Sequence, residues 1–389
     1  MTRKGAWDLQ EVRDKYLEDG WVNVYGLYVV GGGYDGVNGA IGPAYNRARQ
    51  YSSPAQIDGT TWASTMPNSN HYAKFIAHTK TDGSLWSWGY NLFGVLGINQ
   101  NNNRLSSPVQ LPGSTWPKTN LWEKMCISNN QAYAIKTNGT LWAWGSAYNG
   151  NTAQNDGVSR SSPTQVGTDT TWAKVTKGAA IKTDGTLWLW GSNSDGGSGL
   201  GANRSSPVQS GTATTWAQVT KGSNAGMATK TDGTLWVWGG NGYGNLGVND
   251  INQRNTIAQV GTDTTWSTAA GAIATNNNGA AGAIKQDGTL WVMGRNTLGA
   301  LGLNNLTAIS SPTQVPGTNW STLQVDYNNY MRFYKSDGTA WATGYNNNGQ
   351  INNNDRTQRS SPTQIPGVWQ SFGGGLNYAA GSKSGLSAL

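Results

Sequence analysis

The chain has 389 residues, of which 54 are glycine and 20 are tryptophan, and only 12% are charged. This composition excludes a disordered polyampholyte and a helical bundle, and it favours short strands joined by tight turns. The net charge of +7 comes from cations spread along the chain without a run of Lys or Arg, so we expect no nucleic-acid site.

The first segment, residues 1–20, lies outside the pattern that fills the remaining chain. Asp8 is placed as a helix N-cap, and the apolar residues that follow it fall at helical spacing on one face. We expect a short helix that either packs on the rest of the protein or docks on another protein. The docking residues would be Trp7, Leu9, Val12, Tyr16 and Leu17.

The same segment has no apolar core of signal-peptide length, and no stretch of the chain reaches the roughly eighteen apolar residues of a membrane helix. We therefore expect a soluble protein made in a cytoplasm, without membrane insertion. Cys126 is the only cysteine, which excludes an internal disulfide and a cysteine-rich metal site.

From residue 21 onward, three markers recur in one order. The first is a phrase of the type Leu-Trp-x-Trp-Gly, whose final glycine recurs at Gly89, Gly145, Gly191, Gly239, Gly294 and Gly344, with a weaker copy ending at Gly31. The second is Ser-Ser-Pro-x-Gln, as at Ser161–Gln165, degenerate only at Asn255–Gln259. The third is a tryptophan shortly afterwards, at positions 62, 122, 172, 216, 266, 320 and 369. Seven repeats of one supersecondary unit are predicted.

Each unit predicts a β-hairpin. In "IKTDGTLWLWG" two alternating apolar runs flank a Thr-Asp-Gly turn, in which glycine takes a positive φ. The strand that follows is apolar on both faces, as expected of a sheet stacked between two others. We interpret the tryptophans mainly as packing between such sheets; the alternative is an exposed row that stacks sugars or bases.

The phrase "KTDGTLWxWGxNxxGxLG…SSPxQV" resembles the repeats of the regulator-of-chromosome-condensation family, over about Trp21–Leu389. This resemblance implies a seven-bladed β-propeller. The fold expected is therefore all-β, a seven-bladed propeller over 21–389 with a short N-terminal helical segment over 1–20. The last unit lacks the Leu-Trp-x-Trp-Gly strand and the first lacks a partner hairpin, so the N-terminal strand is expected to complete the C-terminal blade.

Catalytic residues are not apparent in this sequence. His71 and His78 have no partners at metal-ligand spacing, and we expect them to pack in loops or at the surface. The recurring aspartates occupy one turn position, where Asn138 replaces Asp in one unit, which suits a turn better than an acid catalyst. We expect no enzyme, no cofactor and no metal.

Two sets of residues remain as binding candidates. The arginines before Ser-Ser-Pro, such as Arg160 and Arg359, either form a cationic ring for an anionic polymer or bond loop carbonyls. The loops after the Trp-Gly phrases differ between units and offer Tyr90, Phe93, Tyr148, Tyr243, Arg295 and Tyr345. Loops on a rigid scaffold commonly carry recognition, and tyrosine among small polar residues is typical of it.

The N-terminal "KGAWDLQEVRDKYL" followed by these repeats also resembles virion proteins of tailed, especially marine, bacteriophages. That resemblance implies a non-enzymatic structural protein of the virion, a tail appendage, fibre or surface decoration. It would be made in the host cytoplasm and bound through residues 1–20 to capsid, neck or tail proteins. Its loops would then meet a host-surface glycan or protein, or another virion protein. The alternatives are a cellular interaction scaffold of the same repeat family and a glycan-binding lectin.

Overall fold

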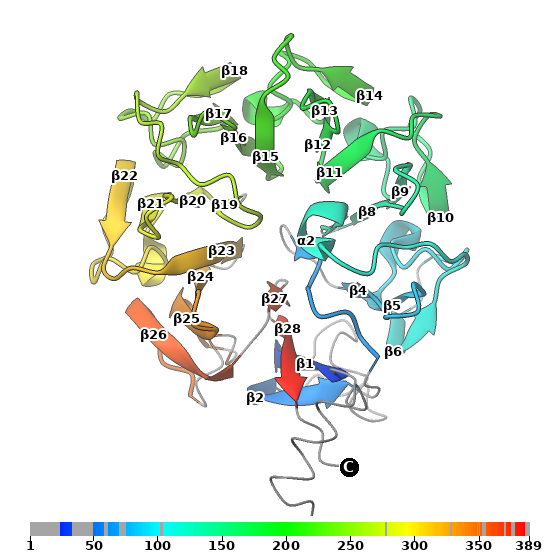
Figure 1. The fold of residues 1–389 in the computed structure, drawn as a ribbon, viewed down its shortest axis with the longest axis horizontal. Helices are drawn as coiled ribbons and strands as arrows, with labels where there is room; N and C mark the ends of the chain where they lie inside the picture. The colour runs from blue at the N-terminus through cyan, green and yellow to red at the C-terminus, as the bar shows by residue number, and fades with distance from the viewer. Residues whose placement is uncertain are drawn as a thin grey trace, which may run out of the picture.

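The computed structural model describes residues 24–32, 50–57, 61–69, 75–101, 104–128, 130–276, 278–326, 329–347, 349, 351, 355–368, 371–374 and 378–385. Their strands form sheets set radially around a central axis, so that the first strand of a sheet lies near the axis and the last at the rim (Figure 1). This arrangement is a β-propeller.

Four consecutive sheets have four strands each, in chain order from the axis outward. They are β11 (Trp172–Thr176), β12 (Ala179–Lys182), β13 (Leu187–Gly191) and β14 (Arg204–Gln209); β15 (Trp216–Lys221), β16 (Ala225–Lys230), β17 (Leu235–Gly239) and β18 (Arg254–Gln259); β19 (Ile273–Thr275), β20 (Ala280–Ile284), β21 (Leu290–Gly294) and β22 (Ile309–Val315); and β23 (Trp320–Asp326), β24 (Tyr330–Lys335), β25 (Thr339–Gly344) and β26 (Arg359–Val368).

Two further sheets depart from this order. One has five strands, β3 (Asn68–Ser69), β7 (Met125–Ile127), β8 (Gln131–Ile135), β9 (Leu141–Gly145) and β10 (Arg160–Gln165). The other joins both ends of the chain, in the order β27 (Ser371–Gly374), β28 (Tyr378–Gly385), β1 (Val24–Gly32) and β2 (Gln50–Ile57). In it β1 runs antiparallel to β28, from Val24 opposite Gly385 to Gly31 opposite Tyr378.

The prediction of seven blades is wrong. Six sheets contain the four or more strands of a blade, whereas the remaining described sheet has three, β4 (Phe75–Thr79), β5 (Leu85–Tyr90) and β6 (Arg104–Gln110). Trp62 stands where its inner strand would begin, but it makes only an isolated bridge to Lys80. The chain that follows forms β3, which pairs in parallel with β7 of the neighbouring sheet.

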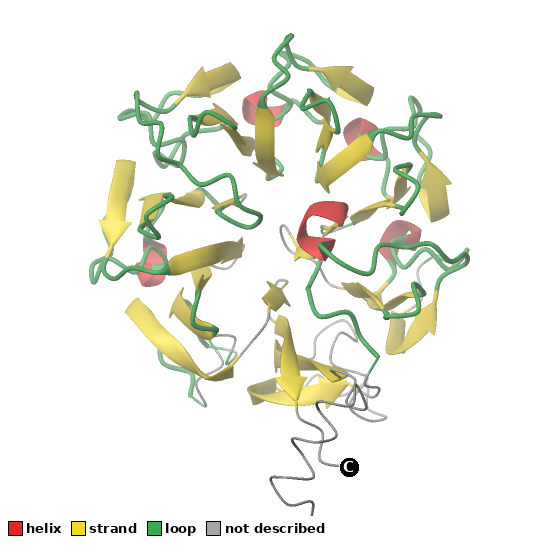
Figure 2. Cartoon of the chain, viewed as in Figure 1, coloured by secondary structure: helices red, strands yellow, loops and turns green. Residues whose placement is uncertain are grey.

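The predicted N-terminal helical segment is not supported either. The described chain contains almost no helix (Figure 2): its α-helix is α2 (Leu121–Lys124), beside the short 3-10 turns η3 (Leu92–Gly94), η4 (Tyr148–Gly150), η5 (Ser194–Gly196) and η6 (Thr297–Gly299). Residues 1–20 lie outside the described part, and so do the docking candidates Trp7, Leu9, Val12, Tyr16 and Leu17. No helix among the described residues is long and apolar enough to cross a membrane.

The Thr-Asp-Gly turns explain one constant part of the repeat. Asp184 Oδ1 accepts hydrogen bonds from the backbone N–H and the hydroxyl of Thr186, at 2.9 and 2.7 Å, and the Thr186 hydroxyl accepts one from the indole of Trp188. Gly185 has φ +78°. Asn138 makes the same bonds to Thr140. A structural turn therefore accounts for the recurring Asp and its exchange for Asn.

In the four phrases that contain two tryptophans, which end at Gly89, Gly145, Gly191 and Gly239, the two have different environments. The second, such as Trp190 or Trp238, is fully buried. The first is half-buried and carries a lysine ammonium over its ring, as Lys182 lies 3.8 Å from the Trp188 ring centroid. Trp238 packs with Leu187 and Leu189 of the preceding sheet, so the second tryptophan closes the contact between blades.

His78 lies in β4 and is fully buried, so it does not pack in a loop or at the surface as predicted. His71 lies outside the described residues. Burial lowers the pKa of His78 from 6.5 to about 4, although Nδ1 lies 2.9 Å from the carbonyl oxygen of Thr79. The neutral imidazole is therefore the stable form in the folded protein.

The low pKa of His78 predicts acid sensitivity. Because the folded pKa lies below the unfolded one, its stabilising contribution is present above pH 6.5 and is lost as the pH falls through 4. When the pH falls from 7 to 4, we expect the wild type to lose about 3 kcal/mol more unfolding free energy than His78→Gln loses. Urea unfolding at both pH values measures this difference, and equal losses would contradict the burial argument.

Candidate functional site

The loops that follow the Trp-Gly phrases form the candidate site, and one buried asparagine fixes each of four loops. Asn241 Oδ1 accepts from the backbone N–H of Leu246, and its amide donates to the carbonyl of Asp250. The same pair of contacts recurs at Asn91, Asn296 and Asn346. In each loop one asparagine side chain therefore satisfies a backbone N–H and a backbone carbonyl that a neighbouring strand would otherwise satisfy.

Four loops, three of them fixed by such an asparagine, are also tied to the next blade. The N–H of Asn155 donates to the carbonyl of Ser205 at 2.7 Å, and a Cβ on Gly150 would lie 2.5 Å from Ser205 Cα. Equivalent bonds run from Asn99 to Ser161, Asn249 to Ser310 and Asn304 to Ser360. The Ser-Ser-Pro marker is therefore the surface that receives the preceding loop, and glycine is required where the two backbones touch.

Within these loops one non-glycine residue often has a left-handed backbone. Asn149 and Asp195, with φ of 55° and 52°, are residue types that tolerate this conformation. Phe93 and Leu298 adopt it as well, at 60° and 63°, although their side chains give no local compensation. Such strain is retained where the surroundings impose it, and it concentrates at functional sites.

The structure brings several of the predicted loop residues together. Phe93 and Tyr148, which are 42% and 75% exposed, line one cavity with Ser194 and Asn224. Tyr243, 48% exposed, lines a second cavity together with Asp195, Asn224 and the exposed Ile251. Because Asn224 borders both cavities, loops of four successive sheets meet on one side of the ring. We call this surface, formed by residues 90–99, 146–157, 192–199, 223–224 and 240–253, the loop face.

The other candidates are less exposed. Arg295 lies 4.8 Å from the ring centroid of Tyr243 and donates to Asn278 Oδ1 and Thr297 Oγ1. Tyr90 lies under the guanidinium of Arg104, 5.0 Å from it, and Tyr345 is half-buried. Arg295 therefore positions Tyr243, whereas Tyr90 and Tyr345 do not line either of these two cavities.

Two lysines of the site were not predicted from the sequence. Lys177 directly follows β11 and Lys221 ends β15, and both line the first cavity although they are only 7% and 1% exposed. The signal was present in the repeated "VTKG" at 175–178 and 219–222, where an apolar inner strand ends in a charge. Sequence alone does not show that the two strand ends converge.

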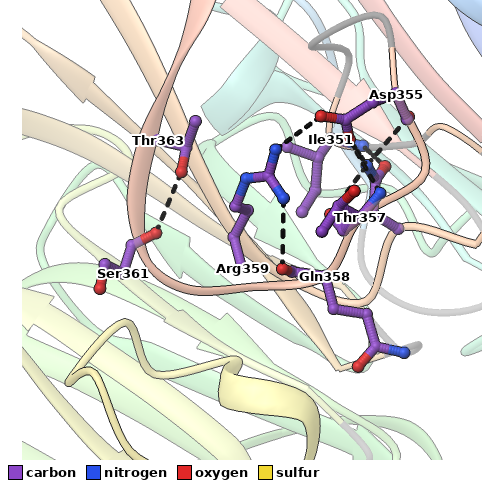
Figure 3. A network of polar contacts seen from close by, with 8 residues as sticks. Ile351, Asp355, Thr357, Gln358, Arg359, Ser361 and Thr363 are labelled. Atoms are coloured by element: carbon purple, nitrogen blue, oxygen red, sulfur yellow. Dashed lines mark hydrogen bonds and ion pairs between the residues drawn. The ribbon is translucent and has the colours of Figure 1, made fainter.

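The arginines before Ser-Ser-Pro bond loop carbonyls and nearby aspartates. In Figure 3, Arg359 donates to the carbonyl of Gln358 and forms an ion pair of 2.6 Å with Asp355. Arg160 with Asp156 and Arg254 with Asp250 repeat this pair. The guanidinium groups therefore hold their own loops, which favours the structural interpretation over a cationic ring for a polymer.

A charged cluster near the axis is separate from these loops. Arg332 is fully buried, its Nη1 lies 3.2 Å from Asp326 Oδ2 on the adjacent strand, and it also donates to Gln324 and Tyr330. Burial raises the pKa of Asp326 to about 6, although Arg332 opposes the rise. Among the described residues no group of His, Cys, Asp and Glu could hold a metal ion.

The fold is a β-propeller, and one stretch of its sequence matches a known repeat. Residues 82–118 match the family model described as the Regulator of chromosome condensation (RCC1) repeat. No curated protein matches the sequence.

Solved structures resemble the fold over nearly the whole chain. Yeast RCC1 (Prp20) bound to Kap60 has a TM-score of 0.78 at 18% identity, covering 94% of this chain and 90% of that one. Prp20p from Saccharomyces cerevisiae, reported with its binding to Gsp1p and histones, has a TM-score of 0.76 at 18% identity, covering 94% of this chain and 93% of that one. Human WBSCR16 has a TM-score of 0.76 at 17% identity, covering 93% of this chain and 99% of that one. At these identities the likeness is one of fold.

Proposed function

We propose that this chain is a non-enzymatic protein-interaction scaffold whose loop face binds a protein partner. The observation that carries the proposal is the gathering of Phe93, Tyr148, Tyr243 and Ile251, all exposed, around two neighbouring cavities. Exposed aromatic side chains beside concave polar surface are typical of protein interfaces. The loops beneath them are held by buried asparagines and by the next blade, so little order has to be gained on binding.

The fold comparisons support an interaction role more than the virion role predicted from the sequence. Prp20 is the RCC1 protein that was solved with Kap60 and studied with Gsp1p and histones. The virion hypothesis depended on residues 1–20, which lie outside the described part, and the comparisons lend it no support. The cellular interaction scaffold, the alternative to that hypothesis, is therefore the function we propose.

Removing two exposed aromatic side chains should weaken partner binding without unfolding the protein. We expect Tyr148→Ala with Tyr243→Ala to reduce capture of protein partners at least about tenfold, because aromatic anchors carry most interface energy. The measurement is quantitative affinity capture from the source cells with the full chain, compared by mass spectrometry.

The matched control is Gln209→Ala with Gln259→Ala, which changes two exposed residues. They pair with Trp188 and Trp236, which lie at the ends of β13 and β17 that are farther from the loops. This control should capture the same partners as the wild type. If the control lost the partners and the tyrosine variant kept them, the binding surface would be on the turn side, and the loop-face proposal would be wrong.

A further inference from the structure

The first cavity of the loop face is lined mainly by polar side chains and by two lysines. Its volume is about 570 Å³, and its walls come from loops of four sheets, with Phe93 and Tyr148 at the exposed part. The other lining side chains are serines, asparagines, one glutamine and two lysines, and none of the described lining residues is acidic. A cavity of this composition suits a small, highly polar group better than an apolar side chain.

The two lysines have no carboxylate among the described residues that line the cavity with them. Lys177 Nζ donates to Ser223 Oγ at 2.7 Å, and Lys221 Nζ lies 3.3 Å from the carbonyl oxygen of Gly222. Asp195, the nearest acid along the loops, accepts a hydrogen bond from Asn224 and lines the second cavity instead. The contacts of these two buried ammonium groups therefore include a hydroxyl and a carbonyl group.

Burial disfavours the charged form of both lysines. Burial lowers the pKa of Lys177 to about 8 and that of Lys221 to about 7, and the charge of Lys177 contributes to the second shift. Cys126, which lies in β7 of the neighbouring sheet, opposes the shift of Lys177 only in part. Both groups would regain full charge if an anion entered the cavity, because an opposite charge favours the ammonium form.

The rim of the cavity carries neutral donors for the same anion. The hydroxyls of Ser192 and Ser194 lie 2.9 Å apart, and the amide of Asn149 donates to Ser192 Oγ. Together with the lysines, these groups surround a space with donors from three loops, and two cations match the charge of a dianion.

We propose that this cavity binds a phosphoryl group carried by the protein partner, with Lys177 and Lys221 as its charged ligands. The inference rests on the proposed function, since it specifies a chemical feature of the partner that the loop face binds. Tyr148 and Phe93 at the opening would contact the residues that flank the phosphorylated side chain.

Isothermal titration calorimetry of the full chain tests the proposal. The probes are the peptide Gly-Gly-phosphoserine-Gly-Gly, its unphosphorylated form and inorganic phosphate. We expect 1:1 binding of the phosphopeptide and of phosphate, and no binding of the unphosphorylated peptide. At pH 8, buffers of different ionisation enthalpy should reveal uptake of on the order of one proton, because the lysines gain protons when the anion binds.

Lys177→Met and Lys221→Met should each weaken binding at least about tenfold and remove part of the proton uptake. Lys118→Met removes one charge from an exposed residue near the Gly83 turn, outside the cavity, and should bind as the wild type does. Thermal unfolding shows whether each variant is folded, and we expect the two cavity variants to unfold at higher temperature than the wild type.

Three results would overturn the inference: no phosphopeptide binding at millimolar concentration, equal binding by Lys221→Met, or binding of free phosphate without the phosphopeptide. The last would assign the cavity to a small anion. None of them depends on the tyrosine variants, so the inference can fail while the loop-face proposal stands.

Discussion

Replacing Arg332 with methionine should destabilise the protein by about 3–5 kcal/mol at pH 7, because removal of one partner leaves a buried charge without compensation. The guanidinium is fully buried and lies 3.2 Å from Asp326, which is itself 2% exposed. Methionine fills similar space but offers no charge and no donor. The Asp326 carboxylate would then have to be protonated or remain ionised in a buried site without its cation.

The pH dependence identifies the cause of this loss. Burial already raises the pKa of Asp326 to about 6, and the variant should raise it further. A folded pKa above the unfolded one favours folding at low pH, and this contribution is lost as the pH rises through the folded pKa. Urea unfolding should therefore show a smaller deficit for Arg332→Met at pH 5 than at pH 7.

The double variant Arg332→Met with Asp326→Asn is the matched control, since it removes both charges. It should recover a large part of the lost stability, because exchanging a buried ion pair for neutral groups is often tolerated. A single variant within 1 kcal/mol of the wild type, or a deficit independent of pH, would contradict this account of the cluster.

Truncation of Trp238 to alanine should cost about 3–5 kcal/mol, as expected for a large aromatic side chain in a core. Trp238 is fully buried, and its ring contacts Leu189 and Gly199 of the preceding blade and Gly226 of its own. A Cβ on Gly226 would lie 2.1 Å from the ring, so the space is filled on that side. The cavity left by alanine would open the contact between two blades.

Trp236, two residues earlier on β17, provides the comparison. It is half-buried under Lys230, whose ammonium lies 4.0 Å from its ring centroid, and it donates to Thr234. We expect Trp236→Ala to cost roughly half as much as Trp238→Ala, because less of the ring is buried. Equal costs in urea unfolding would mean that the second tryptophan has no special role between blades.

The regular parts of this fold could be predicted because the sequence repeats them. The Asp, Gly and Thr of each turn and the alternation in Leu187–Trp190 make local contacts that depend on spacing alone. The three-stranded sheet could not be predicted in this way. Its unit has the marker Trp62, yet the chain after that residue pairs with β7, and no local pattern encodes that choice.

The candidate site shows the same division. Tyr148 and Tyr243 were found because the loops vary between units while the strands do not. Lys177 and Lys221 were missed because the cavity exists only once two inner strands end side by side. The role of the serines in Ser-Ser-Pro was missed for a similar reason, since Ser205 meets Gly150 of the preceding unit. Contacts between blades form only when the units have assembled into the ring, so a pattern within one unit does not predict them.

Hydrogen–deuterium exchange of the full chain, alone and with its captured partner, tests most directly whether the loop face is the binding surface. We predict slower exchange on binding in residues 90–99, 146–157, 192–199 and 240–253, and unchanged exchange in the turns at 183–186 and 231–234. Protection confined to those turns, or to residues 1–20, would contradict the account.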